Sequence, residues 1–160
     1  MTIEQAMFFK VMLLNGHPEE LFGYIDSALE AQDPISDIVL KLSFAGSDDR
    51  SLLHILNEYI ETASLADIDF DGALMDMFVA FFRKKYREEN MSLEECSCLM
   101  YKCALVYAPW EKMWDTATSE LWRVMYYMHD YYEWGVRDEF LKQFNDFLDH
   151  KLPPSSPFRN

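Results

Sequence analysis

Turn-forming residues interrupt this sequence at short intervals, and the segments between them have the apolar spacing of helices. Asn15 and Gly16 end a first segment over residues 3–14, and Pro18 suits the first position of a second helix. In the second segment, apolar side chains recur at the i, i+4 and i+7 spacing that places them on one helical face. No stretch longer than four residues has the pattern of a strand. The sequence therefore predicts an all-α protein.

The same signals predict six further helices. With only five glycines in 160 residues and short connections, successive helices are expected to be antiparallel neighbours. We predict a single domain over residues 1–151, either a bundle or a short helical-hairpin stack of about eight helices. Residues 152–160, which contain three prolines, are predicted to form an extended tail. The third predicted helix runs from the cap Asp33 and Pro34 to Gly46, the fourth starts at a cap at Asp48 or Asp49, and the fifth starts after Asp67 or Asp69 and ends near Glu89. A capping box at Ser92 and Glu95 opens the sixth helix. The last two helices are predicted from Thr116 to Trp134 and from Asp138 to His150.

Negative charge is concentrated in the first half of the chain. Residues 1–82 contain fifteen carboxylates and only three cations (Lys10, Lys41 and Arg50), a net charge of −12, whereas the remainder carries −2 of the total −14. Such a field attracts basic partners and repels nucleic acid and anionic membrane surfaces. The sequence thus favours a basic protein as the partner.

Six of these carboxylates are the predicted partner-binding residues, because they spread over adjacent predicted helices and their connections. The alternative is that they are ordinary solvated positions and helix caps. The six are Asp26, Glu30, Asp33, Asp37, Asp48 and Asp49.

An aromatic segment over residues 122–134 offers a second candidate site. Trp122, Tyr126, His129 and Glu133 share one helical face and form a possible pocket of a small ligand-binding protein or enzyme. A central helix that is contacted on several sides explains the same pattern without any ligand.

No catalytic, cofactor or metal site is predicted. Residues 67–72 resemble the start of a calcium-binding loop, but the required carboxylate at loop position 12 is replaced by Phe78, so helix capping by Asp67, Asp69 or Asp71 is favoured. Of the three cysteines, Cys96 and Cys103 fall on an apolar stripe, and only Cys98 is expected to be reactive.

The start of the chain and its apolar runs bear on the cellular compartment of the protein. The start lacks the basic region of a signal peptide, and the most apolar run, residues 74–82, is far shorter than the ~20 residues of a membrane span. A reducing cytoplasm is therefore expected. The nearly all-apolar segment over residues 3–14 raises a third hypothesis, a structural subunit of an oligomer.

Two parts of the chain carry a family resemblance. The first part comprises residues 18–21 together with residues 33–40, and the second comprises residues 130–133. Together they resemble an uncharacterised bacterial family of small acidic helical proteins. That type is similar to the immunity proteins of polymorphic toxin systems. The resemblance implies a single-domain binding protein of a type often encoded beside a toxin. It carries over no individual site residue. Our leading hypothesis from the sequence is a non-enzymatic binding protein, and its specific form is an immunity protein that neutralises a basic bacterial toxin.

Overall fold

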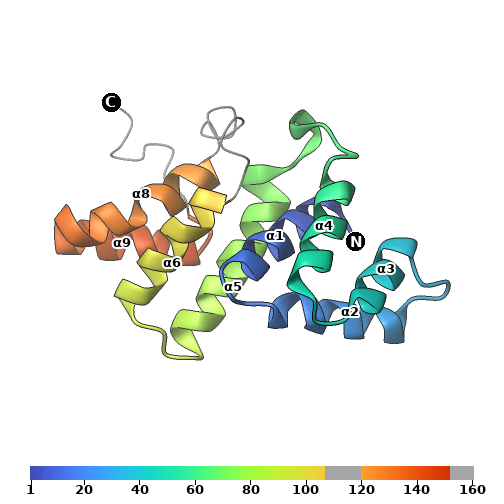
Figure 1. Cartoon of the computed structure of the whole chain (residues 1–160). Coiled ribbons are helices and arrows are strands. Elements are labelled where there is room, and N and C mark those ends of the chain that lie inside the picture. Colours follow the sequence, from blue (N-terminus) through green and yellow to red (C-terminus); the bar gives the residue numbers. More distant parts are fainter. Residues whose placement is uncertain (107–119, 152–160) are drawn as a thin grey trace. The chain divides into compact units, whose positions relative to one another are not determined.

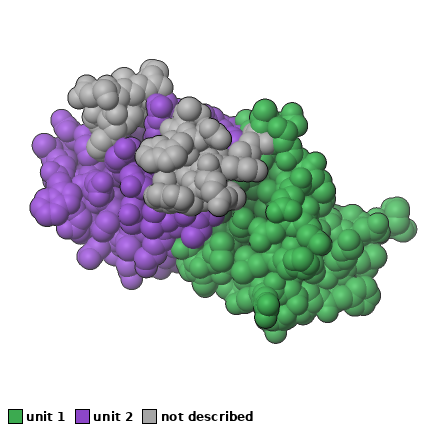
Figure 2. All heavy atoms as spheres, turned by 45° about the horizontal axis from the view of Figure 1, so that its top comes forward, with its two compact units in different colours: residues 1–69 green, residues 70–160 purple. Residues whose placement is uncertain are grey.

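The computed structural model describes residues 1–106 and 120–151, and the regular elements in these ranges are all helical (Figure 1). They comprise eight α-helices and two shorter helical segments, so the predicted all-α class is confirmed. Contacts within the chain cluster into two compact units, Met1–Asp69 and Phe70–Asn160 (Figure 2). The single domain over residues 1–151 stays a prediction, and the predicted tail lies outside the described residues.

The first unit, Met1–Asp69, contains four α-helices and a short 3₁₀ helix. Helix α1 packs against α2 and α4, while α3 contacts both α2 and α4. Thr2 and Gln5 form a capping box at the start of α1, a signal that sequence reasoning missed. The elements are α1 (Ile3–Leu14), α2 (Glu19–Ala31), α3 (Asp37–Ala45), α4 (Asp49–Ile60) and η1 (Leu65–Asp67).

Helix α1 is buried over most of its surface. Ala6 to Phe9 and Val11 to Leu13 are each 6% exposed or less, as the apolar sequence of this segment suggested. Only Leu14, at 45%, exposes a large apolar side chain of this helix. The apolar residues that raised the self-assembly hypothesis are therefore already covered within the chain.

Helix α3 begins later than the sequence indicated. Asp33 and Pro34 were expected to cap and open it, but Asp33–Pro34 is a cis peptide bond in the connection, and the helix starts at Asp37 after the extended residue Ser36. The Ser36 backbone N–H donates to the side-chain oxygen of Gln32 at 3.3 Å, which closes this connection locally. Its predicted end is confirmed, since Gly46 caps the helix with a φ of 62°.

The second unit, Phe70–Asn160, is built around the pairing of α6 with α8. Helix α5 packs against α6 and α9, and α8 also contacts α9. The core between these helices is rich in phenylalanine, including Phe78, Phe82, Phe140, Phe144 and Phe147, each at most 1% exposed. The elements are η2 (Phe70–Leu74, a π-helix), α5 (Met75–Arg87), α6 (Leu93–Val106), α8 (Glu120–Trp134) and α9 (Arg137–Leu148).

The entry to α5 differs from the single helix that was predicted from residue 67 or 69 onward. A 3₁₀ turn over Leu65–Asp67 and the π-helix over Phe70–Leu74 come first, and the α-helix begins only at Met75. Asp71 caps a different helix from the one expected, because its side chain accepts a hydrogen bond from the backbone N–H of Leu121 in the first turn of α8, at 3.0 Å. A carboxylate at a helix N-terminus satisfies one of its unbonded N–H groups.

Two arginines of the basic stretch over residues 83–87 bond to the end of α9 or to the residue just beyond it. Arg83 donates from Nε to the carbonyl oxygen of Leu148 at 3.0 Å, at the last residue of α9. Arg87 pairs with Asp149 at 2.9 Å, just beyond that helix. Guanidinium groups placed there satisfy carbonyls that have no partner within the helix and oppose the negative end of its dipole.

In the described ranges, no helix is both long enough and apolar enough to cross a membrane.

Candidate functional site

The six predicted partner-binding carboxylates are all exposed and all belong to the first unit. Among the described residues, none of the six has an ion-pair partner within 4.0 Å. The ion pairs in this part of the chain are made by other carboxylates. Their negative charge is therefore directed into solvent. Asp26 and Glu30 lie on α2, Asp33 in the following connection, Asp37 at the start of α3, Asp48 at the N-cap of α4, and Asp49 at its first position.

The first unit carries a strong excess of negative charge. Met1–Asp69 contains thirteen carboxylates and three cations, a net charge of −10, and the rest of the chain carries −4. Lys10 is half-buried, and burial lowers its pKa, an effect that the nearby Glu61 partly opposes. Lys41 and Arg50 are exposed.

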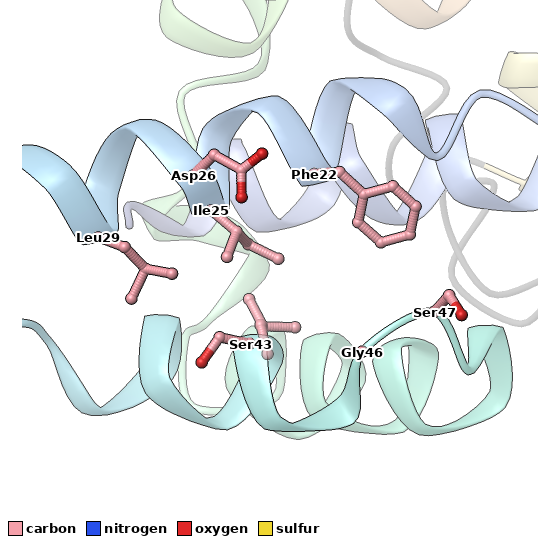
Figure 3. Close-up of a pocket in the computed structure, with 8 residues that line it drawn as sticks. Phe22, Ile25, Asp26, Leu29, Ser43, Gly46 and Ser47 are labelled. Atoms are coloured by element: carbon pink, nitrogen blue, oxygen red, sulfur yellow. The ribbon is translucent and has the colours of Figure 1, made fainter.

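A hollow of about 400 Å³ lies between α2 and α3. Figure 3 shows Phe22, Ile25 and Leu29 reaching from α2 toward α3, with Asp26 on the same helix and Ser43 on the opposite side. Its floor is thus apolar, and one carboxylate stands on its wall. The full lining is Phe22, Ile25, Asp26, Leu29, Leu42, Ser43, Gly46 and Ser47.

A second hollow, of about 440 Å³, lies between α3 and α4 and is lined by more charged residues than the first. It contains the cation Lys41 and the carboxylates Asp37 and Glu58, and the hydroxyl of Tyr59 donates to the carbonyl oxygen of Met1 at 2.6 Å. The remaining lining residues are Ser36, Ile38, Ile55 and Thr62.

The structure places two of the six predicted carboxylates in these hollows, Asp26 in the first and Asp37 in the second. Asp48 directly follows the lining residue Ser47 in the chain. Its carboxylate accepts from the side chain and backbone of Ser51, and these bonds lower the pKa of Asp48. The role of Asp48 as the cap of α4, which the sequence predicted, is confirmed.

The hollows themselves were missed at the level of sequence. The available signal for the first was a row of small residues, Ser43, Gly46 and Ser47, at the end of one predicted helix, facing the large apolar residues of the preceding one. Small side chains opposite large ones leave space between two helices, but only the helix register shows which residues face each other.

The second candidate site forms a packed group of rings on α8. Trp122 is 4% exposed and stacks on Tyr126 with centroids 4.6 Å apart, and Tyr126 contacts Tyr101 of α6 at 5.4 Å. His129 stacks against Tyr132, while Glu133 is exposed. The structure thus brings Trp122, Tyr126 and His129 together on the side of α8 that faces α6.

The buried Ser97 of α6 also contacts this group. Its Oγ donates to the carbonyl oxygen of Glu94 at 3.0 Å and lies 3.3 Å from Nδ1 of His129. The ring N–H of His129 donates in this second contact when Nδ1 carries the proton. Ser97 is fully buried, so its hydroxyl is not exposed to a substrate.

The cysteines of α6 differ in their surroundings. Burial raises the pKa of Cys96 to about 12 and raises that of Cys103 further, whereas Cys98 is partly exposed. Since the thiolate is the reactive form, we expect a maleimide at neutral pH to modify Cys98 alone in the folded protein. Mass spectrometry after digestion measures this. Modification of Cys96 or Cys103 at a similar rate contradicts the buried arrangement of α6.

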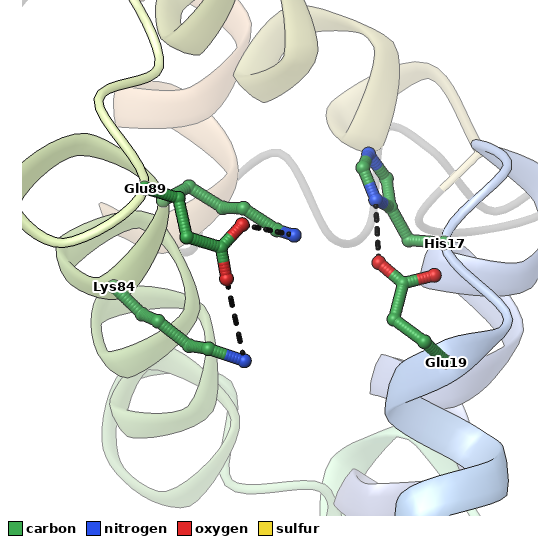
Figure 4. A network of polar contacts seen from close by, with 5 residues as sticks. His17, Glu19, Lys84 and Glu89 are labelled. Carbon is green, nitrogen blue, oxygen red and sulfur yellow. Dashed lines mark hydrogen bonds and ion pairs between the residues drawn. The ribbon is translucent and has the colours of Figure 1, made fainter.

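Charged side chains also pair within each unit (Figure 4). In the first, Nδ1 of His17 lies 3.0 Å from Oε1 of Glu19. In the second, Lys84 and the buried Lys85 both contact the carboxylate of Glu89, at 3.5 and 2.8 Å. These contacts lower the pKa of Glu89. Within the described residues, no three histidines, cysteines or carboxylates are grouped to hold a metal ion.

Comparison of the chain with protein-family models, with curated proteins and with solved structures found no match.

Proposed function

We propose that this chain is a non-enzymatic binding protein whose acidic first unit docks onto a basic protein. The observation that carries the proposal is the set of six exposed carboxylates, none with an ion-pair partner among the described residues, on three consecutive helices and their connections. Carboxylates that are not neutralised within the protein attract a cationic surface and accelerate its association. Two hollows between the same helices add shape to this charge.

The specific form of the proposal is toxin neutralisation. A basic bacterial toxin that acts on a polyanionic substrate has a cationic cleft, and an acidic helical face covers such a cleft by mimicking the substrate. The resemblance of residues 18–21, 33–40 and 130–133 to small acidic bacterial proteins supports this form. Growth of cells that express a basic toxin, with and without this chain, tests it directly.

The general proposal is tested by selection from a random peptide library with two charge variants. The first carries Asp26→Asn, Glu30→Gln, Asp33→Asn and Asp37→Asn in the first unit. The control carries the same change in charge on exposed residues of the second unit, Glu88→Gln, Glu94→Gln, Asp130→Asn and Asp138→Asn.

We expect the natural chain and the control to enrich peptides rich in lysine and arginine. We expect the first variant to bind the enriched peptides about tenfold more weakly, because several charge pairs across an interface are lost. Raising the ionic strength from about 50 to about 300 mM is expected to reduce this difference, since salt screens exposed charges. Enrichment of neutral or acidic peptides, or equal losses in both variants, contradicts the proposal.

A further inference from the structure

The hollow between α2 and α3 combines an apolar floor with a surrounding of negative charge. Phe22, Ile25 and Leu29 supply the floor from α2, and Leu42 supplies it from α3. On α2, Asp26 lies between Phe22 and Leu29 in the chain and lines the same hollow.

Further carboxylates follow lining residues of this hollow in the chain. Glu30 follows Leu29 on α2, and it is exposed. On the opposite side, Asp48 and Asp49 follow directly after the lining residue Ser47, and both are exposed. Among the described residues none of these carboxylates has an ion-pair partner within 4.0 Å. An occupant of the hollow therefore meets apolar surface together with the carboxylate of Asp26.

This inference rests on the proposed function and specifies the partner. We infer that the α2–α3 hollow receives an apolar side chain from a basic amphipathic helix, whose lysines and arginines then lie against Asp26, Glu30, Asp48 and Asp49. Phe22 and Leu29 are seven residues apart on α2, about 10 Å along its axis, which matches two turns of a docked helix. Helices that dock in grooves present anchors at i, i+3, i+4 and i+7, and the same spacing places basic residues beside them.

The lining of the hollow, rather than its size, favours a side chain as its occupant. About 400 Å³ lies within the range of small-molecule sites, but those sites carry several converging polar groups. Here one carboxylate and two serine side chains are the polar lining groups. The hydroxyl of Ser43 already donates to the carbonyl oxygen of Leu40 at 2.8 Å.

The test blocks the hollow without changing any charge. Ser43→Leu places a larger apolar side chain in the hollow from α3. The matched control is Ser27→Leu on α2, because Ser27 is also a helical serine whose hydroxyl bonds to a preceding carbonyl, that of Gly23, but it is exposed and does not line the hollow. Both are single serine-to-leucine changes in the full chain, and circular dichroism verifies that both variants are folded.

The probe is a synthetic helical peptide of leucine and lysine with one apolar face, compared with a leucine and glutamate peptide of the same apolar pattern. Fluorescence anisotropy measures the binding of each. We expect the lysine peptide to bind and the glutamate peptide not to bind. We expect Ser43→Leu to weaken the binding of the lysine peptide about tenfold. We expect Ser27→Leu to change the affinity for this peptide less than about twofold.

Each other outcome contradicts the docking of a basic helix in the hollow and leaves the proposed function to be tested separately. If the lysine peptide binds the natural chain and the Ser43→Leu variant equally, but binds the charge variant of α2 and α3 weakly, the acidic face binds cations and the hollow receives nothing. If both serine variants weaken binding to the same extent, the effect does not belong to the hollow. If the lysine peptide does not bind at all, the hollow does not receive a basic helix, and the library selection decides the proposed function separately.

Discussion

Phe144→Ala is expected to lower the free energy of unfolding by about 3–5 kcal/mol, the cost of emptying a phenylalanine site in a packed core. Phe144 is fully buried in α9, with ring centroids 5.0 Å from Tyr86 of α5 and 5.8 Å from Phe140. Removing the ring deletes these contacts and leaves a cavity that the surrounding helices cannot fully close.

Phe44→Ala is the matched control for this prediction. It deletes the same ring, but Phe44 on α3 is 87% exposed, so we expect a change within about 0.5 kcal/mol. Chemical denaturation followed by circular dichroism measures both variants. Equal effects of the two changes contradict the core described between α5 and α9.

Leu52→Ala is expected to destabilise the first unit by about 2–5 kcal/mol. Leu52 on α4 is fully buried, and α4 contacts both α1 and α3. Because α3 and α4 also border the hollows, loss of this packing is expected to disturb the candidate site as well as the unfolding midpoint.

Leu14→Ala provides the comparison for Leu52→Ala, since it removes the same atoms from a side chain that is 45% exposed. We expect a cost below about 1.5 kcal/mol, because part of that side chain is in water already. Hydrogen exchange detected by mass spectrometry shows where protection is lost. A Leu52→Ala variant that loses no protection within Met1–Asp69 contradicts the arrangement of α1, α3 and α4.

Local signals in the sequence predicted the helices well. The bounds of α1 and the capping roles of Asp48 and of Ser92 with Glu95 agree with the structure, because a cap and its partner are three residues apart. The failure at Pro34 has the same origin: a proline suits the start of a helix and also a turn, and the sequence around it does not distinguish the two.

Contacts between distant segments could not be read from the sequence. Arg83 bonds to the carbonyl of Leu148, 65 residues away, and Asp71 bonds to the N–H of Leu121, 50 residues away. Asp71 was expected to cap its own helix, and no sequence signal indicated the partner of Arg83. The candidate carboxylates were predictable as a group from charge alone, whereas the apolar hollow beside them depends on how α2 and α3 pack.

The internal use of the basic residues of α5 has a consequence for crowded solutions. Arg83 and Arg87 hold the end of α9, and Lys85 is buried against Glu89, so the most cationic stretch of the chain is engaged in contacts within its own unit. Each copy carries a formal net charge of −14, so neighbouring copies repel one another electrostatically. Under the proposed function, this repulsion favours contact of the acidic helices with a basic partner over contact with another copy.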